Sequence, residues 1–175
     1  MDSNNTNHDH SLTASSDHDN SHTNKRKFAT KIGGAIALIC CITQICFQLG
    51  LALGMPWSAI AYGGGDAADN SDKSLSLSLR ITSLVAVFMY AWLAVMVYQR
   101  SFSCKQFVSP VACTRNLRFY TTFMFVEVIL NWMTTSTRER NIWGPFCTIF
   151  FVSLVALSWQ PASSRGGEES RPLLD

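Results

Sequence analysis

The sequence predicts an all-α protein, a four-helix transmembrane bundle with a disordered polar N-terminal tail. The chain has 175 residues, of which 47% are hydrophobic and only 15% are charged. Soluble domains average about 25% charged residues, so this deficit is typical of a membrane protein. The apolar residues are also concentrated in four stretches that contain almost no charge. A helix needs about 20 such residues to cross the hydrocarbon core of a bilayer, and each stretch is long enough.

The N-terminal segment is predicted to be a disordered cytoplasmic tail over residues 1–28. It is rich in Asn, Ser, Asp and Thr and contains all four histidines of the chain. A segment of this composition cannot bury enough apolar surface to become ordered. It does not resemble a cleavable signal peptide, because the apolar run begins only after Lys31.

The membrane domain is expected over residues 29–160, with spans at about 32–54, 81–99, 119–137 and 142–160. The third stretch contains one charged residue, Glu127, and the other three contain none. Aromatic residues lie near the ends of the stretches, as is usual at the membrane interface: Trp57, Tyr98, Tyr120, Trp143 and Trp159. Residues 161–175 then form a short C-terminal tail.

The distribution of Lys and Arg predicts that both termini are cytoplasmic. The two tails and the second connection carry ten of these residues: Lys25, Arg26, Lys27, Lys31, Arg100, Lys105, Arg115, Arg118, Arg165 and Arg171. The first and third connections carry four: Lys73, Arg80, Arg138 and Arg140. Positive charge accumulates on the cytoplasmic side, so the protein is expected to be a multi-pass membrane protein with its N- and C-termini inside.

Charge and cysteine content argue against several other classes of protein. The net charge is +2, and no basic stripe suggests nucleic acid as a partner. The six cysteines form no C-x-x-C pair near a histidine, so no metal site and no cofactor are expected. Ser, His and Asp do not come together outside the N-terminal tail, so no catalytic triad and no enzyme activity are predicted.

Glu127 is the most informative single residue, because a charge inside a membrane span is costly. Asn131 lies on the same helix face, four residues on, and Gln44 and Gln48 share a face of the first span. These four residues are predicted to form an intramembrane polar network. One interpretation is a protonated Glu127 that bonds to the neighbouring amides and holds the helices together. The other is a site that handles protons or cations.

Arginines on the predicted outer side form a second group of interest. Arg80 opens the second span, and Arg138 and Arg140 flank Glu139 in the third connection. Their guanidinium groups could contact an anionic headgroup or ligand. Alternatively, Arg80 extends its charge to the membrane surface and Glu139 pairs with a neighbouring Arg.

The C-terminal tail carries Glu169 followed by Leu173 and Leu174. This pattern resembles the acidic dileucine sorting signal of eukaryotic endosomal, lysosomal or vacuolar membrane proteins. Two exposed leucines offer an apolar plug, and the carboxylate offers a charge for the basic pocket of a sorting adaptor. We therefore expect an adaptor to bind this tail and direct the protein to such a membrane.

Three local motifs together resemble a family of small, uncharacterised four-span integral membrane proteins common in bacteria. They are Gly54-Met55-Pro56-Trp57 with Gly63-Gly64, then Leu79-Arg80-Ile81-Thr82-Ser83, then Asn131 with Ser136, Arg138-Glu139-Arg140 and Trp143-Gly144-Pro145. The resemblance covers about residues 32–158 and implies the four-span architecture but no activity. The polar N-terminal tail and the C-terminal extension depart from that family and suggest a eukaryotic host.

Two functions remain open from the sequence. The first is a non-enzymatic structural or accessory protein of the bilayer, with a membrane-protein partner or a second copy of itself. The second is a small oligomeric transporter or channel for protons or cations that uses the Glu127 face. The first is favoured because the membrane region contains few polar residues.

Overall fold

The computed structural model describes residues 10–57, 61, 76–102 and 107–159. These residues form four helices, and no strand occurs among them: α1 (His10–Ala52), α2 (Leu77–Phe102), α3 (Pro110–Met133) and α4 (Thr137–Ser158). The predicted all-α fold class is confirmed. Three of the helices contain segments long and apolar enough to cross a bilayer: Phe28–Ala52, Leu77–Phe102 and Thr137–Ser158.

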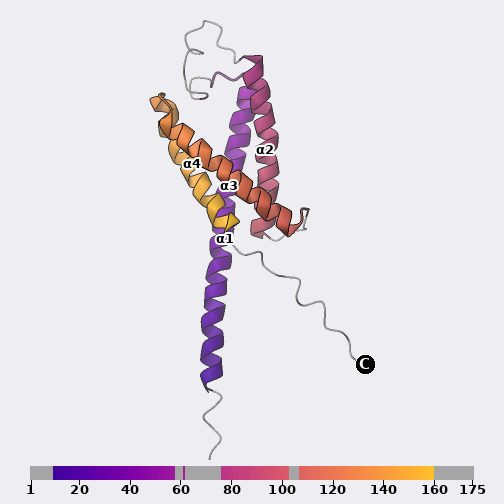
Figure 1. Cartoon of the computed structure of the whole chain (residues 1–175), viewed down its shortest axis with the longest axis vertical. Helices are drawn as coiled ribbons and strands as arrows, with labels where there is room; N and C mark the ends of the chain where they lie inside the picture. Colours follow the sequence, from indigo (N-terminus) through magenta and orange to yellow (C-terminus); the bar gives the residue numbers. More distant parts are fainter. Residues whose placement is uncertain (1–9, 58–60, 62–75, 103–106, 160–175) are drawn as a thin grey trace, which may run out of the picture.

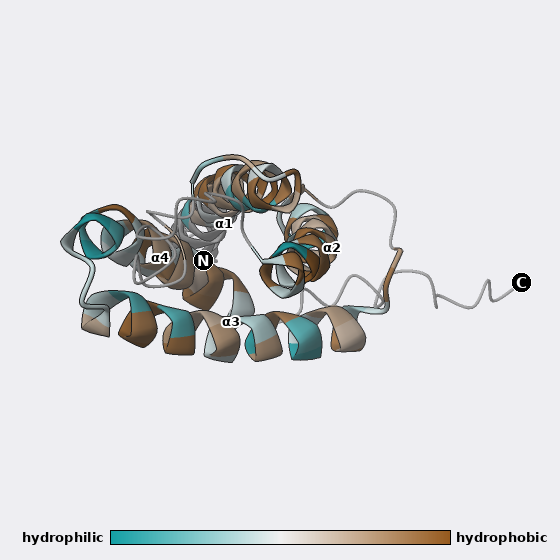
Figure 2. Cartoon of the chain, turned by 90° about the horizontal axis from the view of Figure 1, so that it is seen from above, coloured by the Kyte–Doolittle hydropathy of each residue, from teal (hydrophilic) through white to brown (hydrophobic). Residues whose placement is uncertain are grey.

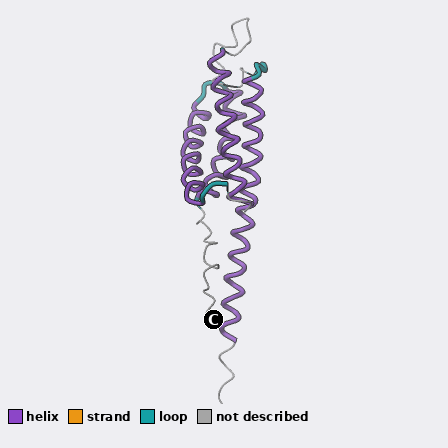
Figure 3. Tube along the Cα trace, turned by 90° about the vertical axis from the view of Figure 1, so that its right-hand side faces the viewer, coloured by secondary structure: helices purple, strands orange, loops and turns teal. Residues whose placement is uncertain are grey.

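The four helices are arranged as two helical hairpins (Figure 1). α1 packs along α2, and α3 packs against α4, while α1 and α4 make the main contact between the two pairs. α3 crosses α1 and α2 obliquely, which is clearest where α1 and α2 are seen nearly end-on (Figure 2). The ends of α1 and α3 and the beginnings of α2 and α4 therefore lie at the same end of the bundle (Figure 3).

The N-terminal part of α1 differs from the sequence prediction. Residues 10–28, which were expected to be disordered, continue the helix that contains the first apolar stretch. Adding a residue to an existing helix is far easier than nucleating a new one, and no Gly or Pro interrupts residues 10–32. This part of α1 extends beyond the other helices (Figure 1). The remainder of the predicted tail, residues 1–9, lies outside the described residues.

Local sequence explains where the helices end. α1 ends with Gly54 in the left-handed region (φ 87°), and the Met55 N–H donates to the Gly50 carbonyl at 2.9 Å. Glycine adopts this conformation without steric cost, so α1 ends before Pro56. α3 begins earlier than predicted because the Ser109 hydroxyl caps it and Pro110 occupies its first turn. It ends at Met133, four residues before the predicted boundary.

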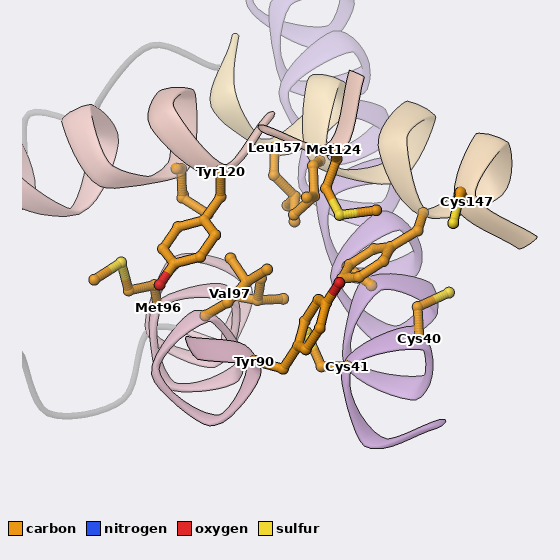
Figure 4. Packing of buried hydrophobic residues seen from close by; sticks show 14 of the residues in the cluster. Cys40, Cys41, Tyr90, Met96, Val97, Tyr120, Met124, Cys147 and Leu157 are labelled. Atoms are coloured by element: carbon orange, nitrogen blue, oxygen red, sulfur yellow. The ribbon is translucent and has the colours of Figure 1, made fainter. Parts of the chain in front are cut away.

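The core lies where the inner faces of all four helices meet (Figure 4). α1 contributes Cys40 and Cys41, and the other helices contribute larger side chains, among them Leu93, Met96, Leu117, Met124, Phe150, Leu154 and Leu157. The small thiols let α1 approach its neighbours closely. The outward faces carry many exposed large apolar residues, as expected of helices surrounded by lipid.

Candidate functional site

Glu127 is bonded to a neighbouring helix inside the bundle. The Tyr90 hydroxyl of α2 donates to the Glu127 carboxylate of α3 and lies 3.1 Å from each of its two oxygens. Tyr90 is only 5% exposed and its ring packs against Phe150 of α4. The packing fixes the ring, so the hydroxyl is held at the carboxylate.

Asn131 lies one turn beyond Glu127 but does not bind its carboxylate. Its side-chain nitrogen donates to the Glu127 backbone carbonyl at 2.8 Å and to the Cys147 sulfur at 3.6 Å. The first bond lies within α3, and the second reaches across to α4. Glu127 and Asn131 therefore connect α3 to two different helices, α2 and α4.

The two glutamines of the predicted network stand apart from Glu127. Gln44 is buried at 5% exposure and Gln48 is partly buried, both on α1. Neither Oε1 atom has a hydrogen-bond partner among the described residues. The structure joins Asn131 to Glu127 only through the Glu127 backbone carbonyl, and it supplies Tyr90 and Cys147 as the side-chain partners in place of the glutamines.

Arg80 caps the end of α1. Its Nε donates to the Ala52 carbonyl at 2.9 Å, and its guanidinium lies over Gly54. A cation beside the last carbonyls of a helix is favourable, because those carbonyls carry partial negative charge and lack partners within the helix. Arg80 thus has a structural role in joining α1 to α2, which neither sequence interpretation included.

Glu139 lies at the α3–α4 corner and is only 9% exposed. Its Oε2 accepts a hydrogen bond from the Thr134 hydroxyl at 3.0 Å. The Ser136 hydroxyl caps α4 by accepting from the Glu139 N–H at 3.4 Å, and the Ser136 N–H donates to the Thr134 hydroxyl at 3.4 Å. Glu139 forms no ion pair with Arg138 or Arg140 in the described structure, which differs from the predicted pairing. The partner of the Glu139 carboxylate is instead Thr134, in the connection between α3 and α4.

A shallow pocket of about 380 Å³ opens at the same corner. Its walls are the last turn of α3 and the first turn of α4, formed by Leu130, Asn131, Met133, Thr134 and Glu139. Arg138, which is exposed, and Arg140, which is partly buried, flank Glu139 in the same first turn of α4. Asn131 belongs both to this pocket and to the Glu127 site.

Tyr90 and Thr134 were not among the residues predicted from the sequence. Tyr90 carries a hydroxyl in the middle of an otherwise apolar stretch, and a buried tyrosine hydroxyl usually has a partner. The Ser136-Thr137-Arg138-Glu139 sequence has the spacing of a capping box, which predicts a helix beginning at Thr137. Both signals are visible in the sequence, but the identity of each partner depends on how the helices pack.

The predicted sorting signal lies outside the described residues. The sorting residues Glu169, Leu173 and Leu174 lie in the undescribed C-terminal segment. Within the described ranges, no group of three or more His, Cys, Asp or Glu residues is arranged to hold a metal ion. The chain matches no family model, no curated protein and no solved structure.

Proposed function

We propose that this multi-pass membrane protein is a non-enzymatic structural or accessory component of the bilayer. The observation that carries this proposal is the hydrogen bond from Tyr90 to both oxygens of Glu127. The partly buried acid has a partner on another helix, so its function is to hold the two hairpins together. Polar side chains that bond across helices are a common means of association in membranes.

The contacts of Asn131 support the same role. Its nitrogen bonds to the Glu127 carbonyl and to Cys147, so its donors are used within the bundle. Tyr90, Glu127, Asn131 and Cys147 thus connect α2, α3 and α4. Among the described residues after residue 28, the only other carboxylate is Glu139 at the α3–α4 corner and no histidine occurs, so no group is placed to continue a proton relay from Glu127.

One observation favours the alternative, a small oligomeric transporter or channel for protons or cations that uses the Glu127 face. Gln44 is buried on α1 with a carbonyl oxygen that has no partner among the described residues. A buried acceptor of this kind is costly, and a passing cation or water would satisfy it. In this alternative, several copies of the chain supply Glu127 around one path.

The membrane arrangement completes the proposal. We propose that α3 is a fourth span and that both termini are cytoplasmic, as the distribution of Lys and Arg indicates. Glu169, Leu173 and Leu174 would then be available to a cytoplasmic sorting adaptor, which would place the protein in an endosomal, lysosomal or vacuolar membrane.

Ion flux through liposomes distinguishes the two functions. Purified full-length protein is reconstituted and proton and monovalent cation fluxes are measured against protein-free liposomes, with Glu127→Gln as the matched variant. A structural protein gives no flux above the protein-free control in either form. Flux in the wild type that disappears in a folded Glu127→Gln variant would overturn the structural proposal and establish the transporter.

The proposed tie between hairpins predicts an energetic coupling between Tyr90 and Glu127. We expect Tyr90→Phe and Glu127→Leu each to lower unfolding stability in detergent. The double variant should lose less than the sum, by about 1 kcal/mol, because both changes remove the same bond. Glu127→Gln retains an acceptor for the hydroxyl and should stay near wild type. Additive losses would show that the two side chains do not stabilise each other.

A further inference from the structure

The pocket at the α3–α4 corner contains acceptors that have no donor. Glu139 lines it, and only Oε2 of its carboxylate has a hydrogen-bond partner, the Thr134 hydroxyl. Asn131 lines it too, and its nitrogen is used by the Glu127 carbonyl and Cys147. This leaves one carboxylate oxygen and one amide oxygen without a donor among the described residues.

The end of α3 adds to this excess of acceptors. Leu130, Asn131 and Met133 belong to its last turn, where carbonyl groups lack partners within the helix. These carbonyls give the helix end a partial negative charge. The hydroxyl of Thr134 does not offset the excess, because it already donates to Glu139. These acceptors therefore match a ligand with several N–H donors, and the Glu139 carboxylate supplies a negative charge to pair with a cationic donor group.

We propose that this pocket binds the primary ammonium group of an aminophospholipid headgroup. An ammonium has three N–H donors, enough to reach Glu139, Asn131 and a carbonyl of the α3 end. The inference is independent of whether Glu127 is structural or takes part in transport. The ammonium group would contact only the side-chain oxygen of Asn131, whose nitrogen is bonded within the bundle.

The position of the pocket favours a lipid as the source of the ammonium group. Glu139 lies in the first turn of α4, at the beginning of the candidate span Thr137–Ser158, where headgroups lie. The apolar walls of the pocket, Leu130 and Met133, are 61% and 75% exposed and would contact acyl chains. Arg138 and Arg140 flank Glu139 along α4, and their positive charges are complementary to the phosphate of the same lipid.

Native mass spectrometry of the full-length protein in detergent tests this proposal. The protein is mixed with phosphatidylethanolamine, its mono- and dimethylated forms, or phosphatidylcholine, all with identical acyl chains. We expect retention to fall with each methyl group, by about tenfold overall, because the quaternary ammonium has no N–H to donate. Equal retention across the series would overturn the proposal, and this comparison needs no variant.

Variants then locate the site. Glu139→Gln keeps an acceptor for Thr134 but removes the negative charge, and it should reduce retention of phosphatidylethanolamine to the level of phosphatidylcholine. Glu127→Gln is the matched control and should bind as the wild type does. Unchanged retention in a folded Glu139→Gln variant would place the lipid elsewhere. Displacement of the lipid by millimolar ethanolamine would identify a site for free amines and overturn the lipid assignment.

Discussion

Two adjacent glycines in α1 show how a single residue sets the distance between helices. A Cβ on Gly34 would overlap the side chain of Ser101 in α2, whereas a Cβ on Gly33 would have no atom within 4 Å. Both glycines are in the same helix and have the same intrinsic propensity. The difference between them is therefore entirely due to α2, which approaches α1 at Gly34.

The pair provides a matched test of this close approach. We expect Gly34→Ala to lower unfolding stability by about 1–3 kcal/mol, because the added methyl group forces α1 and α2 apart. Gly33→Ala should be neutral or stabilising by up to about 1 kcal/mol, since alanine favours the helix. Thermal unfolding in detergent, followed by circular dichroism, measures both. Equal effects of the two substitutions would show that α1 and α2 do not meet at Gly34.

At the scale of the element, α3 is unlike the other three helices. It carries Arg115, Arg118 and Glu127, and it is not among the helices apolar enough to span a membrane by composition. Its polar residues alternate with apolar ones along its length (Figure 2). The Glu127 carboxylate accepts from Tyr90 and the Asn131 nitrogen donates to Cys147, so in the proposed four-span arrangement α3 would depend on its neighbours for a place within the bilayer.

The orientation of α3 can be measured by cysteine accessibility. If α3 crosses the bilayer, an impermeant maleimide should label Arg115→Cys from one side of sealed vesicles and Thr135→Cys from the other, because the two sites flank the helix. The wild type, with its six native cysteines, gives the background labelling. Labelling of both sites from the same side would show that α3 does not cross and would place the C-terminus opposite the N-terminus.

At the scale of the whole molecule, aromatic rings connect the two hairpins at the end where α1 meets α4. Phe47 of α1 lies 4.4 Å from Trp143 of α4 and stacks on Trp57 at 5.7 Å, measured between ring centroids. Gly50 lies beneath Trp57, where a Cβ would overlap the indole ring. These contacts bring the segment after α1 and the second turn of α4 together.

Removal of this connection should loosen the whole bundle. We expect Phe47→Ala to lower unfolding stability by about 2–4 kcal/mol, because the ring leaves a cavity between α1 and α4. Phe88→Ala removes a ring that is 69% exposed on α2 and should change stability by less than about 1 kcal/mol. Chemical unfolding in detergent, monitored by tryptophan fluorescence, reports on both. Similar losses for the two variants would argue against Phe47 as the connection.

The sequence could predict properties that depend on composition along a single helix. Length and hydropathy indicated the four helices and the membrane, and the spacing of Glu127 and Asn131 placed them on one face. The helix boundaries differed by several residues, because capping by Ser109, Ser136 and Gly54 decides them. These capping residues are visible in the sequence, so the helix boundaries could have been predicted from them.

Only the tertiary structure decided which groups became partners. The Glu127 carboxylate accepts a hydrogen bond from Tyr90 rather than from Gln44 or Gln48. Arg80 donates to a carbonyl at the end of α1, and Glu139 accepts from Thr134. The physical reason is that a hydrogen bond requires donor and acceptor within about 3 Å, and the packing angles of the two hairpins set that distance. Hydropathy along one helix is a local property of the chain, whereas contact between helices depends on residues far apart in sequence.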